Sequence, residues 1–320
     1  SGNNTLPFSL SQPREQNSDS YRRAQVMLQT GEEVSFVVAN RNNLPTFEIV
    51  RVIRDRSGTV LGFLVADLDL DEVVFRNLVN DNPAYDLETN VIRSISLLNL
   101  CLRYRVRKVV FSSTCATYGP PERLPMTEDL PQRPINPYGE SKLMFEKMLG
   151  WYRQIHGLEF VAFRYFNAAG ATARCGEHHR VETHLIPNVL KVALGRAPHC
   201  EIYGTDYPTP DGTCIRDYIH VSDLAEAHIR ALAPGVGGFY NLGNGAGYSV
   251  REVVRMCEEV SGARIPVVER PRRPGDPPRL VASADKARRE LGWEPRFPGL
   301  REIVASAWAW HQAHPDGYPD

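Results

Sequence analysis

The stretch from Lys108 to Lys142 constrains the fold more than any other part of the chain. It opens with an apolar run, residues 109–111, of the length expected for a strand buried in a parallel sheet. Residues 112–114 are all hydroxylic and follow at the carboxyl end of that strand. Asn136 and Pro137 then supply the N-cap and the first-turn proline of a helix. This order predicts an α/β fold that binds its ligands at the carboxyl edge of a parallel sheet.

The predicted helix places Tyr138 and Lys142 four residues apart on one face. An ammonium group favours the phenolate form of a neighbouring phenol and so lowers its pKa. The hydroxyl of Thr114, one loop away, can bridge a substrate alcohol to that phenolate. On spacing alone, a Tyr–Lys pair is more often a solvated helix face. Together with the upstream strand it predicts a base that takes a proton from a sugar hydroxyl.

These motifs resemble those of the extended short-chain dehydrogenases/reductases, and specifically of the UDP-glucose 4-epimerases. Four segments and the chain's ending carry the resemblance: FSSTCATYG at residues 111–119, RPINPYGESK at 133–142, RYFNAAG at 164–170, YPTPDGTCIRDYIHVSDL at 207–224 and HPDGYPD at 314–320. It covers residues 83–320, and residues 1–82 do not match the family. The implied fold class is α/β, with a doubly wound, Rossmann-like parallel sheet, a smaller C-terminal substrate lobe and an atypical N-terminal quarter.

The expected domain division follows from that fold. Residues 1–170 form the Rossmann-like domain, within which residues 1–82 are degenerate or foreign, and residues 236–262 return to it. Residues 171–235 and 263–320 mainly form the substrate-binding lobe.

The first quarter is atypical because it has no phosphate-binding glycine loop. The family's Gly-x-x-Gly-x-x-Gly motif stands between the first strand and the first helix, whereas residues 11–15 here are SQPRE. Side chains at these positions occupy the space that a pyrophosphate needs. Residues 47–53 and 60–66 instead predict a hairpin about the turn at residues 55–58.

The resemblance implies NAD as the cofactor, and the missing glycine loop is the feature that argues against it. It also implies that Thr114, Tyr138 and Lys142 are catalytic, with Tyr138 taking the proton of the substrate's 4-hydroxyl. The implied contacts to the nicotinamide end come from Asn90, Ser112, Tyr138, Lys142 and Tyr165. Asn90 is equally well explained as the N-cap of the helix predicted after it.

For the UDP-sugar substrate, the resemblance implies a second set of contacts. Arg216 and Arg273 would hold the pyrophosphate, because guanidinium groups suit phosphate oxygens. Asp276 would accept a hydrogen bond from a ribose hydroxyl. The remaining implied contacts are Asn167, the pair His184 and Leu185, and Ile202 and Tyr203 on either side of the uracil.

One further cluster in the sequence has the residue types of metal ligands: Glu177, His178, His179, Glu182 and His184. Their spacing fits no compact zinc pattern, and the resemblance assigns this loop to the uridine diphosphate. We therefore expect no metal.

Composition restricts the remaining partners. With a net charge of −1, the chain is not expected to bind nucleic acid or a membrane. Its six cysteines have no paired spacing, which indicates reduced thiols and a cytoplasmic location. The expected partners are the UDP-sugar and a second copy of the chain in a homodimer.

The implied function is UDP-hexose 4-epimerisation, the interconversion of UDP-glucose and UDP-galactose by transient oxidation at C4. A nucleotide-sugar dehydratase would need an acid and a base directly after Thr114, where Cys115 and Ala116 stand. A catalytically silent UDP-sugar-binding protein would account for the missing glycine loop. A third alternative joins a sensor-like module in residues 1–82 to an epimerase remnant.

Overall fold

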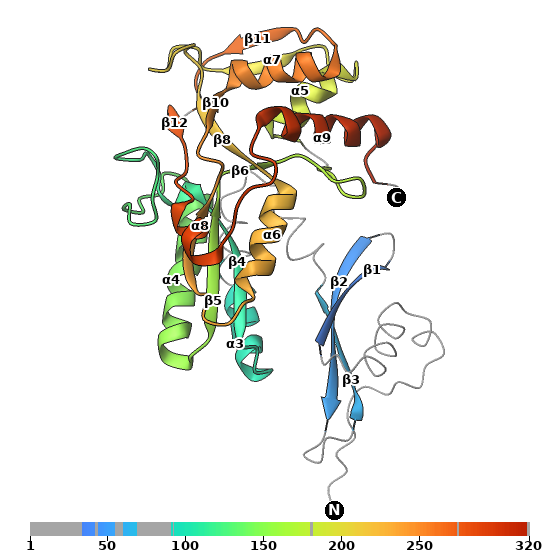
Figure 1. Cartoon of the computed structure of the whole chain (residues 1–320), viewed down its shortest axis with the longest axis vertical. Helices are drawn as coiled ribbons and strands as arrows, with labels where there is room; N and C mark the ends of the chain where they lie inside the picture. Colours follow the sequence, from blue (N-terminus) through green and yellow to red (C-terminus); the bar gives the residue numbers. More distant parts are fainter. Residues whose placement is uncertain are drawn as a thin grey trace, which may run out of the picture. The chain divides into compact units, whose positions relative to one another are not determined.

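The computed structural model describes residues 34–41, 44–54, 60–68, 91, 93–179, 182–273 and 275–318 (Figure 1). The chain divides into two compact units, residues 1–80 with Asp320, and residues 81–319. None of the helices in these described ranges combines the length and apolarity needed to cross a bilayer.

The described part of the first unit is a sheet of three antiparallel strands. These are β1 (Val34–Arg41), β2 (Leu44–Arg54) and β3 (Val60–Leu68), in the order β1-β2-β3. The pairing of β2 with β3 confirms the predicted hairpin. Antiparallel neighbours of this kind differ from the parallel order of a nucleotide-binding half. The SQPRE segment at residues 11–15 lies outside the described residues.

The second unit contains the predicted parallel sheet, and its helices cover both faces. The strands are β4 (Lys108–Thr114), β5 (Glu159–Tyr165) and β9 (Gly238–Leu242), in the order β4-β5-β9. On β5, Phe160 and Ala162 pack with α3 (Ser94–Arg103) and α4 (Pro137–His156). Its alternate residues Val161 and Phe163 pack with α6 (Val221–Ala231) and α8 (Asp285–Leu291). Since successive strand residues face opposite ways, a strand apolar at every position requires helices on both sides.

The remaining elements form a second layer of strands and helices. Around β8 (Ile215–His220) lie β6 (Asn167–Ala169), β10 (Gly247–Ser249) and β12 (Arg279–Leu280). A separate parallel pair consists of β7 (Cys200–Tyr203) and β11 (Val267–Arg270). Three helices, α5 (Leu185–Ala193), α7 (Val250–Ser261) and α9 (Leu300–Ala313), share one core with β7. Of residues 236–262, therefore, β9 joins the parallel sheet while α7 packs against α5 and α9.

Local sequence signals account for the ends of several helices. The side chain of Asn136 accepts a hydrogen bond from the Gly139 amide at 2.8 Å and caps α4 as predicted. Ser249 and Glu252 form the capping box that begins α7. Among the described residues, α3 begins at Ser94, and Val91 and Arg93 just before it are also helical. Asn90, predicted to open that helix, lies outside the described residues.

A buried ion pair attaches α4 to the sheet. Arg164 on β5 donates to both carboxylate oxygens of Glu146 on α4, at 3.0 and 2.7 Å. The two side chains are only 3% and 2% exposed. Ser113 on β4 donates to the same carboxylate at 2.5 Å, so one group ties together two strands and the helix. A buried ion pair is stable only when hydrogen bonds satisfy both charged groups. Removing one partner leaves the other charge buried without a counterion, which destabilises the fold.

We predict that Glu146→Gln lowers the free energy of unfolding by about 3–5 kcal/mol, because it leaves the Arg164 charge buried without its counterion. The matched control is Arg301→Gln, which removes the exposed pair with Glu259 and should change stability by less than about 1 kcal/mol. Urea unfolding followed by circular dichroism measures both. Equal effects of the two substitutions would show that the buried pair does not stabilise the sheet.

Candidate functional site

The site begins where β4 ends, at a turn fixed by Thr114. This residue is 9% exposed, and its hydroxyl oxygen accepts a hydrogen bond from the Ala116 amide at 3.1 Å. The chain then forms a single helical turn, η3 (Cys115–Thr117), in which the Thr117 hydroxyl donates to the Thr114 carbonyl at 3.0 Å. The strand thus ends abruptly, and Thr114 stays at the carboxyl edge of the sheet.

The first turn of α4 lies directly against that turn, because Gly139 has no side chain. A Cβ at this position would stand 2.4 Å from the Ala116 carbonyl oxygen, far inside contact distance. Gly139 follows Tyr138, so the close approach brings the tyrosine's turn of helix to η3 and the end of β4. This is the juxtaposition that the sequence predicted for Thr114 and Tyr138.

Lys142 points from α4 toward the end of β4. Its Nζ lies 5.7 Å from the centroid of the Tyr138 ring and 5.1 Å from that of Phe111. The same ammonium group donates to the carbonyl oxygen of Ser112 at 3.3 Å. A positive charge is therefore held beside the tyrosine ring by a strand carbonyl, as the helical spacing indicated.

A hydrogen-bond chain runs from Ser112 away from this pair. The Ser112 hydroxyl lies 2.9 Å from the Tyr165 hydroxyl, which lies 2.6 Å from Nε2 of His228 on α6. Nδ1 of His228 lies 2.7 Å from the Leu224 carbonyl, which can only accept. Nδ1 must therefore carry the proton, and in neutral histidine Nε2 then accepts. Tyr165 donates to His228, and Ser112 donates to Tyr165.

His228 was not among the residues predicted from the sequence. It stands 63 positions from Tyr165, on a helix whose apolar pattern suggests only packing. Burial lowers the pKa of His228, which keeps it neutral and able to accept. Burial also raises the pKa of Tyr165, to about 12, so the phenol keeps its proton. Tyr165 and His228 lie far apart in the sequence and come together because α6 packs beside β5.

The predicted nucleotide-binding residues come together in two pairs. Arg216 on β8 forms an ion pair with Asp276 at 3.0 Å and also donates to the Pro277 carbonyl at 2.8 Å. The guanidinium carbon of Arg273 lies 4.0 Å from the centroid of the Tyr203 ring, an arrangement typical of a cation–π contact. Because β7 pairs with β11 and β8 with β12, the segment that joins β11 to β12 places Arg273 and Asp276 beside these strands.

The other predicted substrate contacts lie at element ends or in the core. Asn167, half-buried, begins β6 directly after the carboxyl end of β5, and half-buried Leu185 begins α5. Ile202 is 1% exposed and packs in the core beside α5 and α7, so its side chain faces away from solvent. The contact predicted for Asn90 falls outside the described residues.

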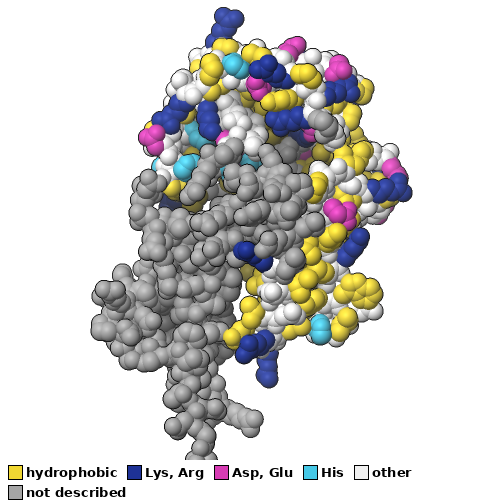
Figure 2. All heavy atoms as spheres, turned by 180° about the vertical axis from the view of Figure 1, so that it is seen from behind, with side chains coloured by type: hydrophobic (Ala, Val, Ile, Leu, Met, Phe, Trp, Pro, Cys, Tyr) yellow, Lys and Arg dark blue, Asp and Glu magenta, His cyan; other side chains and the backbone are white. Residues whose placement is uncertain are grey.

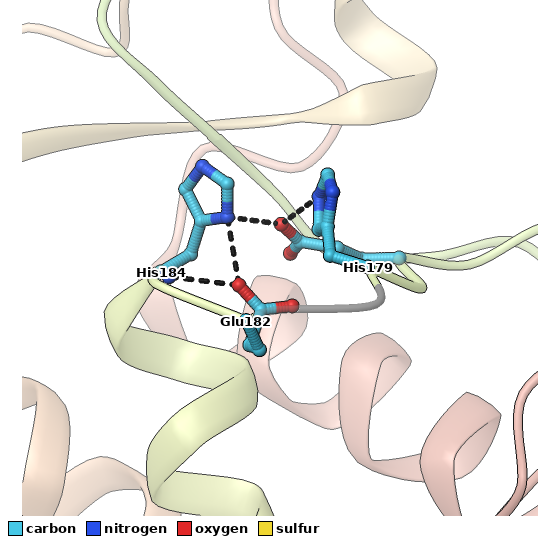
Figure 3. Close-up of side chains that lie close together, drawn as sticks. His179, Glu182 and His184 are labelled. Atoms are coloured by element: carbon cyan, nitrogen blue, oxygen red, sulfur yellow. Dashed lines mark hydrogen bonds and ion pairs between the residues drawn. The ribbon is translucent and has the colours of Figure 1, made fainter. Parts of the chain in front are cut away.

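The loop before α5 forms a compact charged cluster (Figure 3). Nδ1 of His184 lies 2.8 Å from a carboxylate oxygen of Glu177 and 2.8 Å from one of Glu182. Nε2 of His179 lies 3.1 Å from the same oxygen of Glu177. Hydrogen bonds to the two carboxylates raise the pKa of His184 to about 10. Burial acts to raise the pKa of Glu177, but the two histidines outweigh it and lower that pKa to about 2.

The chain matches one known protein family over more than half of its length. The profile of the NAD dependent epimerase/dehydratase family matches residues 25–243, which includes part of the atypical first quarter. A UDP-glucose 4-epimerase of Halalkalibacterium halodurans is 53% identical over 242 residues, 74% of this chain and 72% of the relative. One of Corynebacterium glutamicum is 43% identical over 303 residues, 91% of this chain and 92% of the relative.

Solved structures give the same result. The chain resembles the UDP-glucose 4-epimerase from Bifidobacterium longum in complex with NAD+ and UDP, with a TM-score of 0.70 and 40% identity. The match covers 73% of this chain and 72% of that one. Another UDP-glucose 4-epimerase structure, 51% identical, also gives a TM-score of 0.70, with 73% of each chain covered.

We predict that His228 makes stability depend on pH in a defined direction. Burial lowers its pKa below the ordinary value of 6.5, so its contribution is present above that value and is lost as pH falls. His228→Gln keeps an acceptor for Tyr165 but does not titrate. The unfolding free energy of the wild type should therefore fall relative to that of His228→Gln between about pH 8 and about pH 5.5. Urea titrations at both pH values measure the difference, and a difference independent of pH would contradict the lowered pKa of His228.

Proposed function

Because the chain belongs to the NAD-dependent epimerase/dehydratase family, and within it to the UDP-glucose 4-epimerases, we propose that it interconverts UDP-glucose and UDP-galactose. The reaction inverts the configuration at C4 of the hexose without net oxidation. The observation that carries the proposal is the arrangement at the carboxyl edge of the sheet, where Lys142 lies beside Tyr138 and is held by the carbonyl of Ser112.

In the proposed reaction, Tyr138 takes the proton from the 4-hydroxyl of the hexose and later returns it. The neighbouring ammonium group of Lys142 stabilises the phenolate that this transfer needs. Thr114 stands at the end of β4 and orients the same hydroxyl. Inversion requires the 4-keto sugar to present its other face before the proton and the hydride return.

The cofactor is NAD, which when bound accepts the hydride from C4 and gives it back. The described residues fit its nicotinamide end: Ser112, Lys142 and Tyr165 present a hydroxyl, an ammonium group and a phenol at one edge of the sheet. This is the edge at which open α/β sheets bind nucleotides. Tyr138 and Asn90 complete the proposed set.

The UDP moiety is proposed to lie along β7 and β8. Arg216 and Arg273 would hold the pyrophosphate, with Asp276 on a ribose hydroxyl and Tyr203 beside the uracil. The other proposed contacts are Asn167, His184, Leu185 and Ile202, the last through its backbone because its side chain is buried. Guanidinium groups already positioned by an ion pair and a ring stack support this assignment.

The residues after Thr114 argue against a dehydratase. Elimination of water needs an acid and a base there, and this chain has Cys115 and Ala116. Cys115 is 8% exposed, and burial raises its pKa to about 12. Such a thiol does not exchange protons at neutral pH, which supports epimerisation.

The state of the cysteines supports a cytoplasmic location, which we also propose. All six lie in the described part of the chain and are free thiols, four of them buried. Free thiols are typical of a reducing compartment.

We predict that Tyr138→Phe lowers turnover of UDP-galactose by about 10²- to 10⁴-fold, since the base is lost. The affinity for UDP should stay unchanged, because Tyr138 lies away from the nucleotide contacts. Tyr152→Phe, on the same helix but with its hydroxyl donating to Asn99, is the matched control and should retain wild-type turnover. A coupled assay for UDP-glucose measures both variants. Wild-type turnover in Tyr138→Phe would show that Tyr138 is not the base.

We predict that NAD binds much more weakly than UDP. Pyrophosphate binds at a helix N-terminus through unpaired amides, which need residues without a Cβ nearby. Residues 11–15 provide bulky side chains, a proline and a carboxylate instead. Calorimetry with each ligand separately tests this, with Arg216→Gln as the control that should weaken UDP alone. Stoichiometric NAD retained through purification would show that residues 11–15 do not limit its binding.

We further propose that the chain forms a homodimer through α3 and α4. Both helices expose large apolar side chains: Ile95 (37%), Leu97 (41%), Leu100 (46%), Met144 (37%), Trp151 (60%) and Ile155 (66%). Figure 2 shows hydrophobic side chains gathered on the lower part of the described surface, where these two helices lie. A contiguous apolar patch of this kind is typical of a subunit interface.

We predict that Trp151→Glu converts the dimer into a monomer, because a charge would be buried in the proposed interface. Ile229→Glu, on α6 and equally exposed at 65%, should leave the dimer intact. Sedimentation velocity gives the mass of each variant. A monomeric wild type, or dissociation in both variants, would place the interface elsewhere.

A further inference from the structure

The charged cluster before α5 has the geometry of a metal site. Glu177, His179, Glu182 and His184 each offer one ligand atom, and these atoms all lie within 4.8 Å of one another. Figure 3 shows His179 and His184 close together, with Glu182 beside His184, and both imidazoles lie within 3.1 Å of the same carboxylate oxygen of Glu177. We propose that these four side chains bind one zinc-like divalent cation.

The distances are close to those of a tetrahedral site. Bonds of about 2.0–2.1 Å from zinc to nitrogen or oxygen place tetrahedral ligand atoms about 3.3–3.5 Å apart. Two of the contacts here, from Nδ1 of His184 to Glu177 and to Glu182, are already 2.8 Å, and that from His179 to Glu177 is 3.1 Å. The remaining separations, which reach up to 4.8 Å, must shorten when the ion binds.

The ligand set selects the class of cation. Two imidazoles and two carboxylates suit zinc and its transition-metal neighbours, and the carboxylates balance the charge of a divalent ion. Magnesium and calcium prefer oxygen ligands throughout. The sequence led us to expect no metal because the spacing Glu-x-His-x-x-Glu-x-His matches no compact zinc pattern. The folded loop nevertheless brings the four side chains together, which their spacing in the sequence does not indicate.

The loop that carries these ligands is anchored independently of the cluster. The Tyr318 hydroxyl accepts from the Gly176 amide at 2.9 Å and donates to its carbonyl at 3.0 Å. Gly176 lies flat against the ring of Trp310, where a Cβ would stand 2.1 Å away. His184 directly precedes α5. Such prior positioning of the first and last ligands reduces the entropy lost on binding the ion.

Four protein ligands leave no open position, so the proposed role of the ion is structural. It would join the anchored part of the loop to the beginning of α5, the position of Leu185. The proposal concerns metal binding alone and does not depend on the reaction assigned to the chain.

The test is zinc binding by the full chain after chelator treatment and dialysis into metal-free buffer. Calorimetric titration with zinc chloride should show one saturable site per chain. His179→Asn and Glu182→Gln should each weaken zinc binding by on the order of tenfold or more. The matched controls are His178→Asn, whose ring accepts from the Tyr318 amide outside the cluster, and Cys175→Ser, which removes the exposed thiol. Both controls should bind zinc as the wild type does.

X-ray absorption of the zinc-loaded wild type keeps the proposal testable if a variant fails to fold. It should show four nitrogen and oxygen neighbours at about 2.0–2.2 Å and no sulfur at about 2.3 Å. Absence of saturable binding, unchanged affinity in both cluster variants, or sulfur in the zinc shell would each overturn the proposal.

Discussion

The parallel pairing of β4 with β5 is the constraint on which the site depends. Its register sets Thr114 opposite Tyr165, so both strands end at the same edge with their polar residues together. The ion pair between Glu146 and Arg164 then fixes α4 against both strands. Tyr138 and Lys142 occupy defined positions at that edge because the helix bearing them cannot shift without breaking a buried charge pair.

Much of this arrangement could be predicted from the sequence, because the relevant signals are local. A hydroxyl-rich strand end, an asparagine N-cap and a proline in the first turn determine β4 and the start of α4 within a short stretch. The continuous apolar run of β5, residues 160–163, indicates burial on both faces. For the same reason the hairpin of β2 and β3 was foreseeable from its turn and its two apolar runs.

What the sequence did not reveal depends on contacts between distant segments. His228 acquires a role only because α6 packs beside β5, and no local pattern marks it. The convergence of Glu177, His179, Glu182 and His184 likewise depends on a loop held by Tyr318 at the far end of the chain. Ile202 illustrates a different case, since the side chain at a motif position expected beside the ligand packs in the core.

In the ion pair between Arg216 and Asp276, the Asp276 carboxylate already occupies the guanidinium group that a ligand phosphate would bind. Any ligand that reaches Arg216 must displace or share a carboxylate already 3.0 Å away. If Arg216 binds the pyrophosphate as proposed, a phosphate can meet that requirement because it brings more negative charge than the carboxylate it replaces. An uncharged free hexose cannot. On that assignment, the pair would favour phosphorylated ligands over free sugars, because only a phosphate could compete with Asp276 for Arg216.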